Sequence, residues 1–166
     1  VYWQLDGTGN LQFSAVNGTN GTLDGWATIA DTAVTSVPWR ISMKNIKTMN
    51  VVEGHTINIK AAATLDNMFL NCAQLTNADF SQFDTTYLAG AQRMFYGCTS
   101  LEGIDLTPWS GKTARLLNIA QMFNGCTALT DVKGMNNWKN TNLSNMGETF
   151  QNCSALTTLD VSKFTS

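Results

Sequence analysis

Residues 94–101 read "MFYGCTSL", and the same phrase returns three more times in the chain. It reads "MFLNCAQL" at 68–75, "MFNGCTAL" at 122–129 and "TFQNCSAL" at 149–156. All four cysteines of the 166-residue chain stand at the same place in this phrase, with steps of 26, 28 and 27 residues. Self-similarity at a fixed period of this length is the signature of a repeat architecture. The phrase therefore decides the fold.

The residues in front of each cysteine carry an apolar stripe. A phenylalanine stands three places before every cysteine, and apolar residues stand four and seven places before that phenylalanine. In the second unit these residues are Leu88, Ala91 and Phe95. Residues at this spacing share one face of an α-helix. The pattern therefore predicts a short amphipathic helix before each cysteine.

After each cysteine the apolar residues recur with a period of two. The segments 75–81, 101–107, 129–135 and 156–162 share the pattern L-x-x-Φ-x-Φ, where Φ is mostly apolar. Such alternation predicts a short strand with one buried face. An aromatic residue follows in each unit, and Trp138 stands one place late, which indicates an insertion in the third unit.

One such unit cannot bury its own apolar face, but stacked units can, with their strands paired in parallel. The L-x-x-Φ-x-Φ pattern at this period is the leucine-rich-repeat signature. We therefore expect an α/β fold, a leucine-rich-repeat solenoid with a parallel sheet and short helices on the other side. The solenoid is expected over residues 46–166, with a period of about 27 residues.

The resemblance to one family is closer than this general class. "NMFLNCAQLTNADFSQFDT", "RMFYGCTSLEGIDLTPW" and "ETFQNCSALTTLDVSKFTS" resemble the BspA-like leucine-rich repeats of bacterial surface proteins. The resemblance covers about residues 60–166, although Lys133 and Gly134 stand where the family has Asp and Leu. Members of that family are anchored or secreted proteins that contact host matrix, mucus or other cells. The resemblance therefore implies an extracellular protein, on the bacterial cell surface or secreted.

Residues 1–45 are expected to form an N-terminal cap, because the open end of a solenoid needs a cover. "VYWQLDGTGNLQFSA" at 1–15 reads as a β-hairpin, since two alternating apolar arms flank a turn rich in Gly, Asp and Asn. Residues 27–34 favour a helix that ends before Pro38.

"NIKTMNVVEG" at 45–54 then resembles the first strand of the solenoid, with Ile46, Met49 and Val51 turned inward. At the other end, no closing helix or polar cap follows the last repeat. We therefore expect the chain to be a segment of a longer array, with further repeats of the same chain beyond residue 166.

The cysteines are expected to form a line along the solenoid, because they occupy equivalent positions on successive units. Four sulfurs on a line, about 4.8 Å or more apart, cannot converge on a tetrahedral zinc ion. A disulfide between neighbours would be strained at that spacing. A free buried cysteine behaves as a small hydrophobic residue, and the flanking Phe and Leu residues favour burial. We therefore expect a ladder of unpaired, buried cysteines.

Composition and motifs disfavour several functions. The formal net charge of −2 gives no basic footprint for a nucleic acid. No apolar run is long enough to cross a membrane. The chain has one histidine, His55, and no nucleophile with an identifiable base nearby. We therefore expect neither an enzyme nor a cofactor or metal site.

The residues between the inward-facing strand positions are expected to point outward, onto the concave face of the sheet. The candidate binding residues on this face are Asn50, Asn77, Asp79, Asp105, Asp131, Lys133 and Asp160. Their mostly acidic column can be interpreted as a shallow groove for a basic or hydroxyl-rich partner. Alternatively, the carboxylates bind backbone N–H groups of their own loops, as short polar side chains commonly do.

The aromatic residue after each strand presents a similar choice. These residues are Phe83, Trp109, Trp138 and Phe164. Exposed rings could stack on sugars or clamp a partner, and Trp109 and Trp138 are the candidates for such a role. Packed beneath the loops, the same rings would instead form a second apolar spine.

Together these observations favour a non-enzymatic cell-surface binding module, part of a bacterial adhesin. The expected partner is a protein or glycan of a host or of another cell surface. The alternative is a structural spacer that holds a distal binding domain away from the cell wall. An exposed charged or aromatic cluster on one face would favour binding, and a uniform Asn, Thr and Ser surface would favour the spacer.

Overall fold

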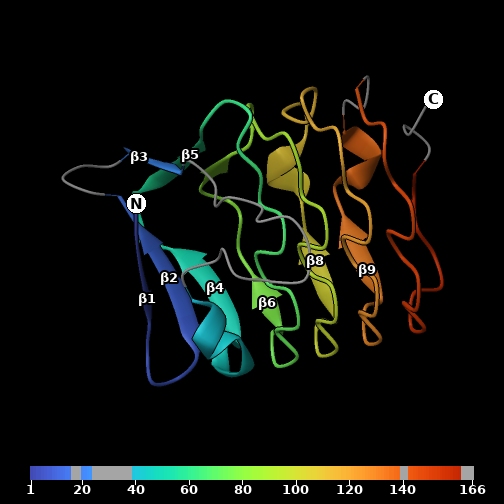
Figure 1. Ribbon diagram of the computed structural model, residues 1–166, viewed down its shortest axis with the longest axis horizontal. Coiled ribbons are helices and arrows are strands. Elements are labelled where there is room, and N and C mark those ends of the chain that lie inside the picture. The colour runs from blue at the N-terminus through green and yellow to red at the C-terminus, as the bar shows by residue number, and fades with distance from the viewer. Residues whose placement is uncertain (16–19, 24–38, 139–141, 162–166) are drawn as a thin grey trace.

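The computed structural model describes residues 1–15, 20–23, 39–138 and 142–161. It is a mixed, sheet-dominated structure in which similar units lie side by side along the long axis (Figure 1). One sheet has the order β1-β2-β4-β6, a second β3-β5-β7, and a third β8-β9. The strand bounds are β1 Tyr2–Leu5, β2 Asn10–Ser14, β3 Asn20–Leu23, β4 Thr48–Val51, β5 Thr56–Ile59, β6 Asn77–Ala78, β7 Phe83–Asp84, β8 Gly103–Asp105 and β9 Asp131–Lys133.

The predicted N-terminal hairpin is confirmed. Strands β1 and β2 pair antiparallel, with Trp3 opposite Phe13. Strand β2 then pairs in parallel with β4, so that Phe13 lies beside Val51. The hairpin thus extends the sheet of the repeats at one end of the molecule (Figure 1). The helix predicted at 27–34 lies outside the described residues.

The strand prediction is confirmed in the first three repeats and wrong in the fourth. The predicted inward positions of the first two repeats, Ala78 and Phe80 among them, are at most 4% exposed. In the fourth repeat, residues 156–161 form no strand. Leu159 is only half-buried there and Val161 is 41% exposed. Strand β9 therefore has a strand partner on one side only within the described chain.

The α-helices predicted before the cysteines are not present. The described helices are all of the 3-10 type, namely η1 Arg40–Asn45, η2 Thr107–Trp109 and η3 Met135–Asn137. The segments before the cysteines are successive turns, in which two residues per unit have positive φ. In the third unit these residues are Gln121 at 58° and Gly125 at 78°. A left-handed residue at these points is incompatible with a continuous right-handed helix.

Hydrogen bonds between units replace those of a helix. We call residues 64–71, 90–97, 118–125 and 145–152 the turn column. Within it the N–H of Phe69 donates to the carbonyl of Met94 at 2.8 Å, and the N–H of Phe95 donates to Met122 at 2.8 Å. Parallel bridges also link the starts of consecutive units, from Thr64 through Gly90 and onward. Each segment of the turn column is thus held by backbone hydrogen bonds to the adjacent units.

The core between the column and the sheet contains a continuous stack of phenylalanine rings. Phe95 lies 5.6 Å from Phe69 and 5.3 Å from Phe123, with nearly parallel rings. Phe150 continues the stack at 5.4 Å from Phe123. Equivalent residues of adjacent units therefore pack against each other.

The predicted burial of the cysteine ladder is confirmed. All four cysteines are free and at most 9% exposed. The thiol of Cys98 donates to the Phe69 carbonyl of the preceding unit at 3.1 Å, and Cys126 does the same to Phe95 at 3.0 Å. Burial raises the pKa of the Cys126 thiol to about 12, so these thiols are held in the neutral form.

The extra residue predicted in the third unit lies between Gly134 and Trp138, because Asp105 pairs with Lys133 and Trp109 ends η2 whereas Trp138 follows η3. Gly134 has a left-handed φ of 90° and precedes η3. After it, Met135, the first residue of η3, is buried at 1% exposure. The alternation within residues 129–135 predicts that Met135 lies on the outer face of the sheet, and this expectation is wrong.

Candidate functional site

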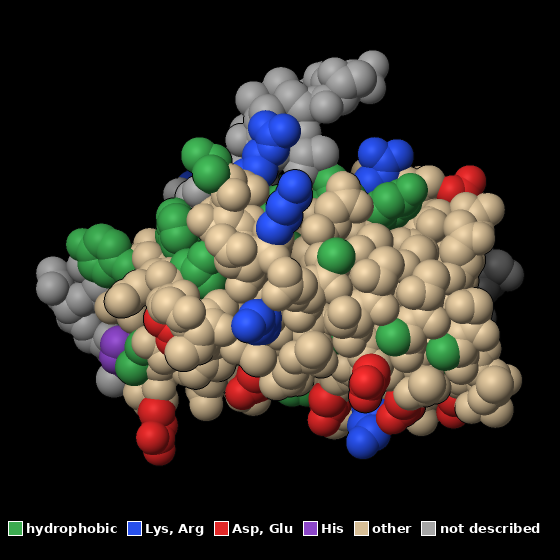
Figure 2. Space-filling view, turned by 90° about the horizontal axis from the view of Figure 1, so that it is seen from below, with side chains coloured by type: hydrophobic (Ala, Val, Ile, Leu, Met, Phe, Trp, Pro, Cys, Tyr) green, Lys and Arg blue, Asp and Glu red, His purple; other side chains and the backbone are tan. Residues whose placement is uncertain are grey.

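The predicted outward face exists. Six of the seven candidate residues are exposed, and Asn50 is half-buried. In Figure 2 acidic side chains gather along one edge of the molecule, and most of the visible Lys and Arg side chains lie away from it. The sheet therefore carries an acidic surface, but its residues do not all have the same local contacts.

Three of the candidates are engaged within the fold. Asp79 accepts a hydrogen bond from the N–H of Ser81 at 2.8 Å, and Asp105 accepts one from Thr107 at 2.8 Å. Hydrogen bonds from Thr107 lower the pKa of Asp105. Asn50 accepts from the Asn10 side chain at 3.1 Å. These contacts match the structural alternative, in which short polar side chains close their own loops.

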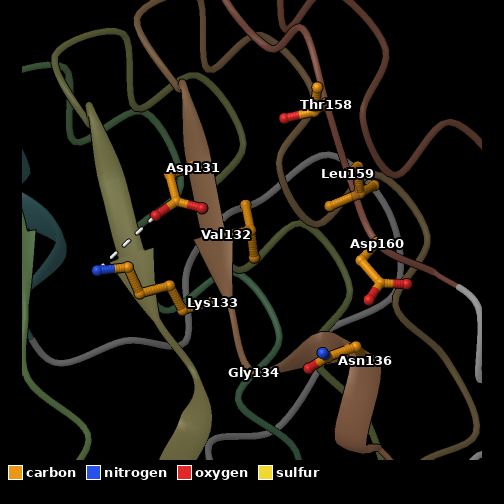
Figure 3. Close-up of a pocket in the computed structure, with 8 residues that line it drawn as sticks. All are labelled: Asp131, Val132, Lys133, Gly134, Asn136, Thr158, Leu159 and Asp160. Carbon is orange, nitrogen blue, oxygen red and sulfur yellow. Dashed lines mark ion pairs between the residues drawn. The ribbon is translucent and has the colours of Figure 1, made fainter.

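A groove of about 630 Å³ opens between β9 and residues 158–160. It gathers three of the predicted residues, Asp131 and Lys133 from β9 and Asp160 from the neighbouring segment (Figure 3). Val132, Gly134, Asn136, Thr158 and Leu159 complete the lining. The groove lies on the side of β9 that has no strand partner within the described chain, so the polar groups of β9 on that side are open to solvent.

Asp131 and Lys133 form only a weak ion pair in this groove. Lys133 Nζ lies 3.9 Å from Asp131 Oδ2, and the two side chains are 67% and 58% exposed. Exposed ion pairs at such a distance contribute about 0–1 kcal/mol. Both groups can therefore exchange this contact for a ligand at little cost. Asn136 was not predicted, because the insertion and η3 place it in the groove.

Of the two alternatives for the aromatic residues, the exposed one, for which Trp109 and Trp138 are the candidates, is wrong. Trp109 is 0% exposed and Trp138 is 3% exposed. Their rings stack at 5.5 Å with an interplanar angle of 15°. A 3-10 turn after each strand directs the ring under the loops. The alternative of a second apolar spine holds for these two residues and for the buried Phe83, whereas Phe164 lies outside the described residues.

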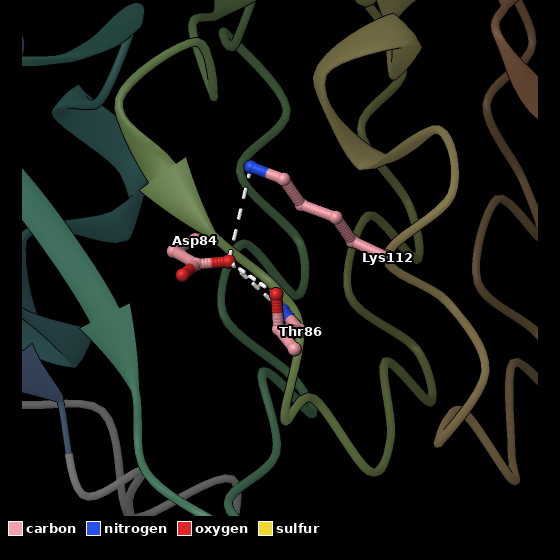
Figure 4. Close-up of polar contacts among 3 residues, drawn as sticks. All are labelled: Asp84, Thr86 and Lys112. Atoms are coloured by element: carbon pink, nitrogen blue, oxygen red, sulfur yellow. Dashed lines mark hydrogen bonds and ion pairs between the residues drawn. The ribbon is translucent and has the colours of Figure 1, made fainter.

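A polar contact on the other sheet joins two units rather than forming a site. Asp84 accepts hydrogen bonds from the hydroxyl of Thr86 at 2.7 Å and from its N–H at 3.2 Å (Figure 4). Lys112 of the next unit lies 3.8 Å from the same carboxylate oxygen. The Thr86 hydroxyl, assisted by Lys112, lowers the pKa of Asp84. This cluster ties adjacent loops together.

The residues considered for other chemistry have structural surroundings. His55 accepts a hydrogen bond from the N–H of Ala15 through Nδ1, at 3.0 Å. Within the described ranges, no group of three or more His, Cys, Asp or Glu residues is placed to hold a metal ion. Likewise, no helix in the described part of the chain has the length and apolarity needed to cross a bilayer.

Comparisons with known proteins give a family and little more. A family model described as "Mycoplasma protein of unknown function, DUF285" matches residues 39–164. The crystal structure of a T. pallidum leucine-rich-repeat protein aligns with 98% of this chain and 89% of its own, at 17% identity and a TM-score of 0.31. A score this low carries no argument about the fold. No curated protein matches the chain.

Proposed function

The chain belongs to the DUF285 family, and from this premise we propose that it is a non-enzymatic binding module of a bacterial surface protein. The repeat phrase that it shares with BspA-like proteins supports this proposal and an extracellular location. In the same proposal the stacked units form a leucine-rich-repeat solenoid. The partner is a protein or glycan of host matrix, mucus or another cell.

The observation that carries the proposal is the groove beside β9. Asp79 and Asp105 bind the backbone of their own loops. By contrast, Asp131 and Lys133 share only one long, exposed ion pair. A site with carboxylate, ammonium and amide groups within one groove offers both donors and acceptors. Such a site suits a hydroxyl-rich glycan or a polar loop of a protein.

The test is a binding array of glycans and matrix proteins, followed by titration of each positive with variants. The double variant Asp131→Asn/Asp160→Asn should weaken binding at least about tenfold, which corresponds to about 1.4 kcal/mol. The matched control is Glu53→Gln, which removes an exposed carboxylate far from the groove in sequence. Equal affinity of the two variants would place the binding surface elsewhere.

The structural spacer remains the second candidate function. The continuous hydrogen bonding along the turn column favours it, because a rigid stack of units can act as a spacer without binding a ligand. The same array decides between the two proposals. Failure of the chain to bind any glycan or matrix protein, while a longer protein containing it does bind, would favour the spacer.

A further inference from the structure

The backbone hydrogen bonds between the alternating rows of the turn column run in one direction. In each unit, alternate N–H groups donate to the following unit, and alternate carbonyls accept from the preceding one. In the third unit the donors are Ile119, Gln121, Phe123 and Gly125, and their acceptors are Asn145, Gly147, Thr149 and Gln151. A β-strand edge alternates donors with acceptors. In this column, in contrast, the backbone N–H donors of a row face the following unit and its acceptor carbonyls face the preceding one, while the Phe carbonyl additionally accepts the cysteine thiol of the following unit.

The donor edge of the fourth unit is open. The equivalent N–H groups belong to Met146, Glu148, Phe150 and Asn152. None of these four backbone donors has an acceptor among the described residues. Three earlier copies of the same row are fully paired, whereas the fourth copy has no following unit among the described residues.

An apolar surface lies beside these donors. It forms a groove of about 250 Å³ lined by Ile119, Met146, Thr149, Phe150, Leu159 and Val161. Met146 is 48% exposed, whereas Leu65, Ala91 and Ile119 at the equivalent positions are at most 1% exposed. Phe150 stacks on Phe123 on one side. The exposed side of the fourth unit therefore resembles one half of the interface between two internal units.

At the opposite end of the column, one carbonyl of the acceptor edge is already occupied. This edge carries the carbonyls of Thr64, Asp66, Met68 and Leu70, and that of Met68 receives a hydrogen bond from the indole Nε1 of Trp39 at 2.9 Å. Met68 is 0% exposed and Leu70 is 5% exposed. A second copy of this chain could therefore stack head to tail only by displacing Trp39. Two donor edges cannot pair row to row either, because the acceptor carbonyls that match the N–H row lie on the other edge of the column.

We propose that the row Met146–Asn152 is a docking surface for a further unit of the same repeat, which continues the stack beyond the fourth unit. The occupant offers carbonyls at four alternate residues and an aromatic ring that covers Phe150. It also brings a thiol that donates to the Phe150 carbonyl, as Cys98 does to Phe69 and Cys126 to Phe95. This surface is separate from the groove beside β9. Loss of ligand binding would therefore leave the proposal intact.

The test appends a copy of residues 112–138 after residue 166, which keeps the repeat in phase. Amide hydrogen exchange is then followed by NMR. In the original chain the four amides of Met146, Glu148, Phe150 and Asn152 should exchange rapidly. In the extended chain their exchange should slow by about a hundredfold or more, in the alternating pattern of the internal units.

The control is the same extension with the copy of Phe123 changed to Asp, which cannot stack on Phe150. With this altered extension, the four amides should still exchange rapidly. Rapid exchange in the extended chain, whether or not the added unit folds, would overturn the proposal. Protection of these amides in the original chain would also overturn it. If that protection grows with protein concentration, the occupant is a second copy; if not, the edge is already covered.

Discussion

Single residues in this protein are fixed by how closely the neighbouring unit approaches. Gly134 illustrates this, because a Cβ at this position would lie 2.5 Å from the carbonyl carbon of Leu106 and closer still to the nitrogen of Thr107. The sequence indicated an insertion near Trp138 but not that Gly134 would adopt a left-handed φ. The reason is that the left-handed φ of Gly134 depends on contact with the preceding unit, which spacing alone does not reveal.

Replacing Gly134 with alanine should lower the free energy of unfolding by about 3 kcal/mol or more, because the clash is with backbone and the φ is left-handed. Gly111→Ala is the matched control, with a φ of 73° and no atom within 4 Å of the added Cβ. It should cost only about 1 kcal/mol. Urea unfolding measures both, and equal costs would contradict the close approach.

The cysteine thiols make stability depend on alkaline pH. Burial raises the pKa of Cys72 and of Cys126 to about 12, whereas an unfolded cysteine titrates near about 8.5. The folded state therefore keeps its proton where the unfolded state loses it. Stability is fully present below the unfolded pKa and falls as the pH rises toward the folded pKa, by about 1.4 kcal/mol per pH unit for each such thiol.

We expect the urea midpoint to fall between about pH 9 and 10.5, and to fall less steeply in Cys126→Ala. The comparison between the two proteins removes the contribution of Tyr and Lys, which they share. Thiol reagents should label no cysteine before denaturation and all four afterwards. Identical slopes for the two proteins would show that this thiol is not shielded in the folded state.

At the scale of the element, sequence reasoning identified which positions are buried but not the conformation that buries them. The stripe of Leu88, Ala91 and Phe95 is buried as predicted, yet its backbone is a series of turns. Arg93 and Gln121 adopt positive φ although Arg and Gln are good helix formers. Hydrogen bonds to the next unit override local propensity there. The only local signal is the Asn or Gly two places after each Phe, since these residues tolerate a left-handed backbone.

Gly125→Ala distinguishes turns from a helix by the sign of its effect. In an α-helix, alanine in place of glycine would stabilise the protein by about 1 kcal/mol. At the observed φ of 78°, with ordinary contact at 3.6 Å to Gly97, the same change should destabilise it by about 1–2 kcal/mol. The control Gly7→Ala, with open space around the added Cβ, should shift thermal stability little. A raised melting temperature for Gly125→Ala would instead indicate that this segment is an α-helix.

The candidate site shows the same division between pattern and conformation. Alternation placed Asp131 and Lys133 of β9 outside the core, as observed. It could not separate them from Asp79 and Asp105, whose carboxylates close their own loops. It also left the Trp109 ring free to be exposed, because the 3-10 turn that buries it has no periodic signal.

At the scale of the whole molecule, each unit contacts its neighbours, so the energetic effect of a change depends on its place in the stack. Internal units are buried from both sides, whereas the fourth unit is covered on one side in the described chain. Opening should therefore begin at the fourth unit, since local stability follows the density of packed contacts.

Equivalent phenylalanines make this gradient measurable. Phe123 is 0% exposed and stacks between Phe95 at 5.3 Å and Phe150 at 5.4 Å. Phe123→Ala should therefore cost about 3–5 kcal/mol. Phe150 has one stacking neighbour and is only half-buried, so Phe150→Ala should cost roughly half as much. Phe95→Ala serves as the control and should match Phe123→Ala. Equal losses at Phe123 and Phe150 would mean that the fourth unit is covered on both sides, and the open donor edge would then have no basis.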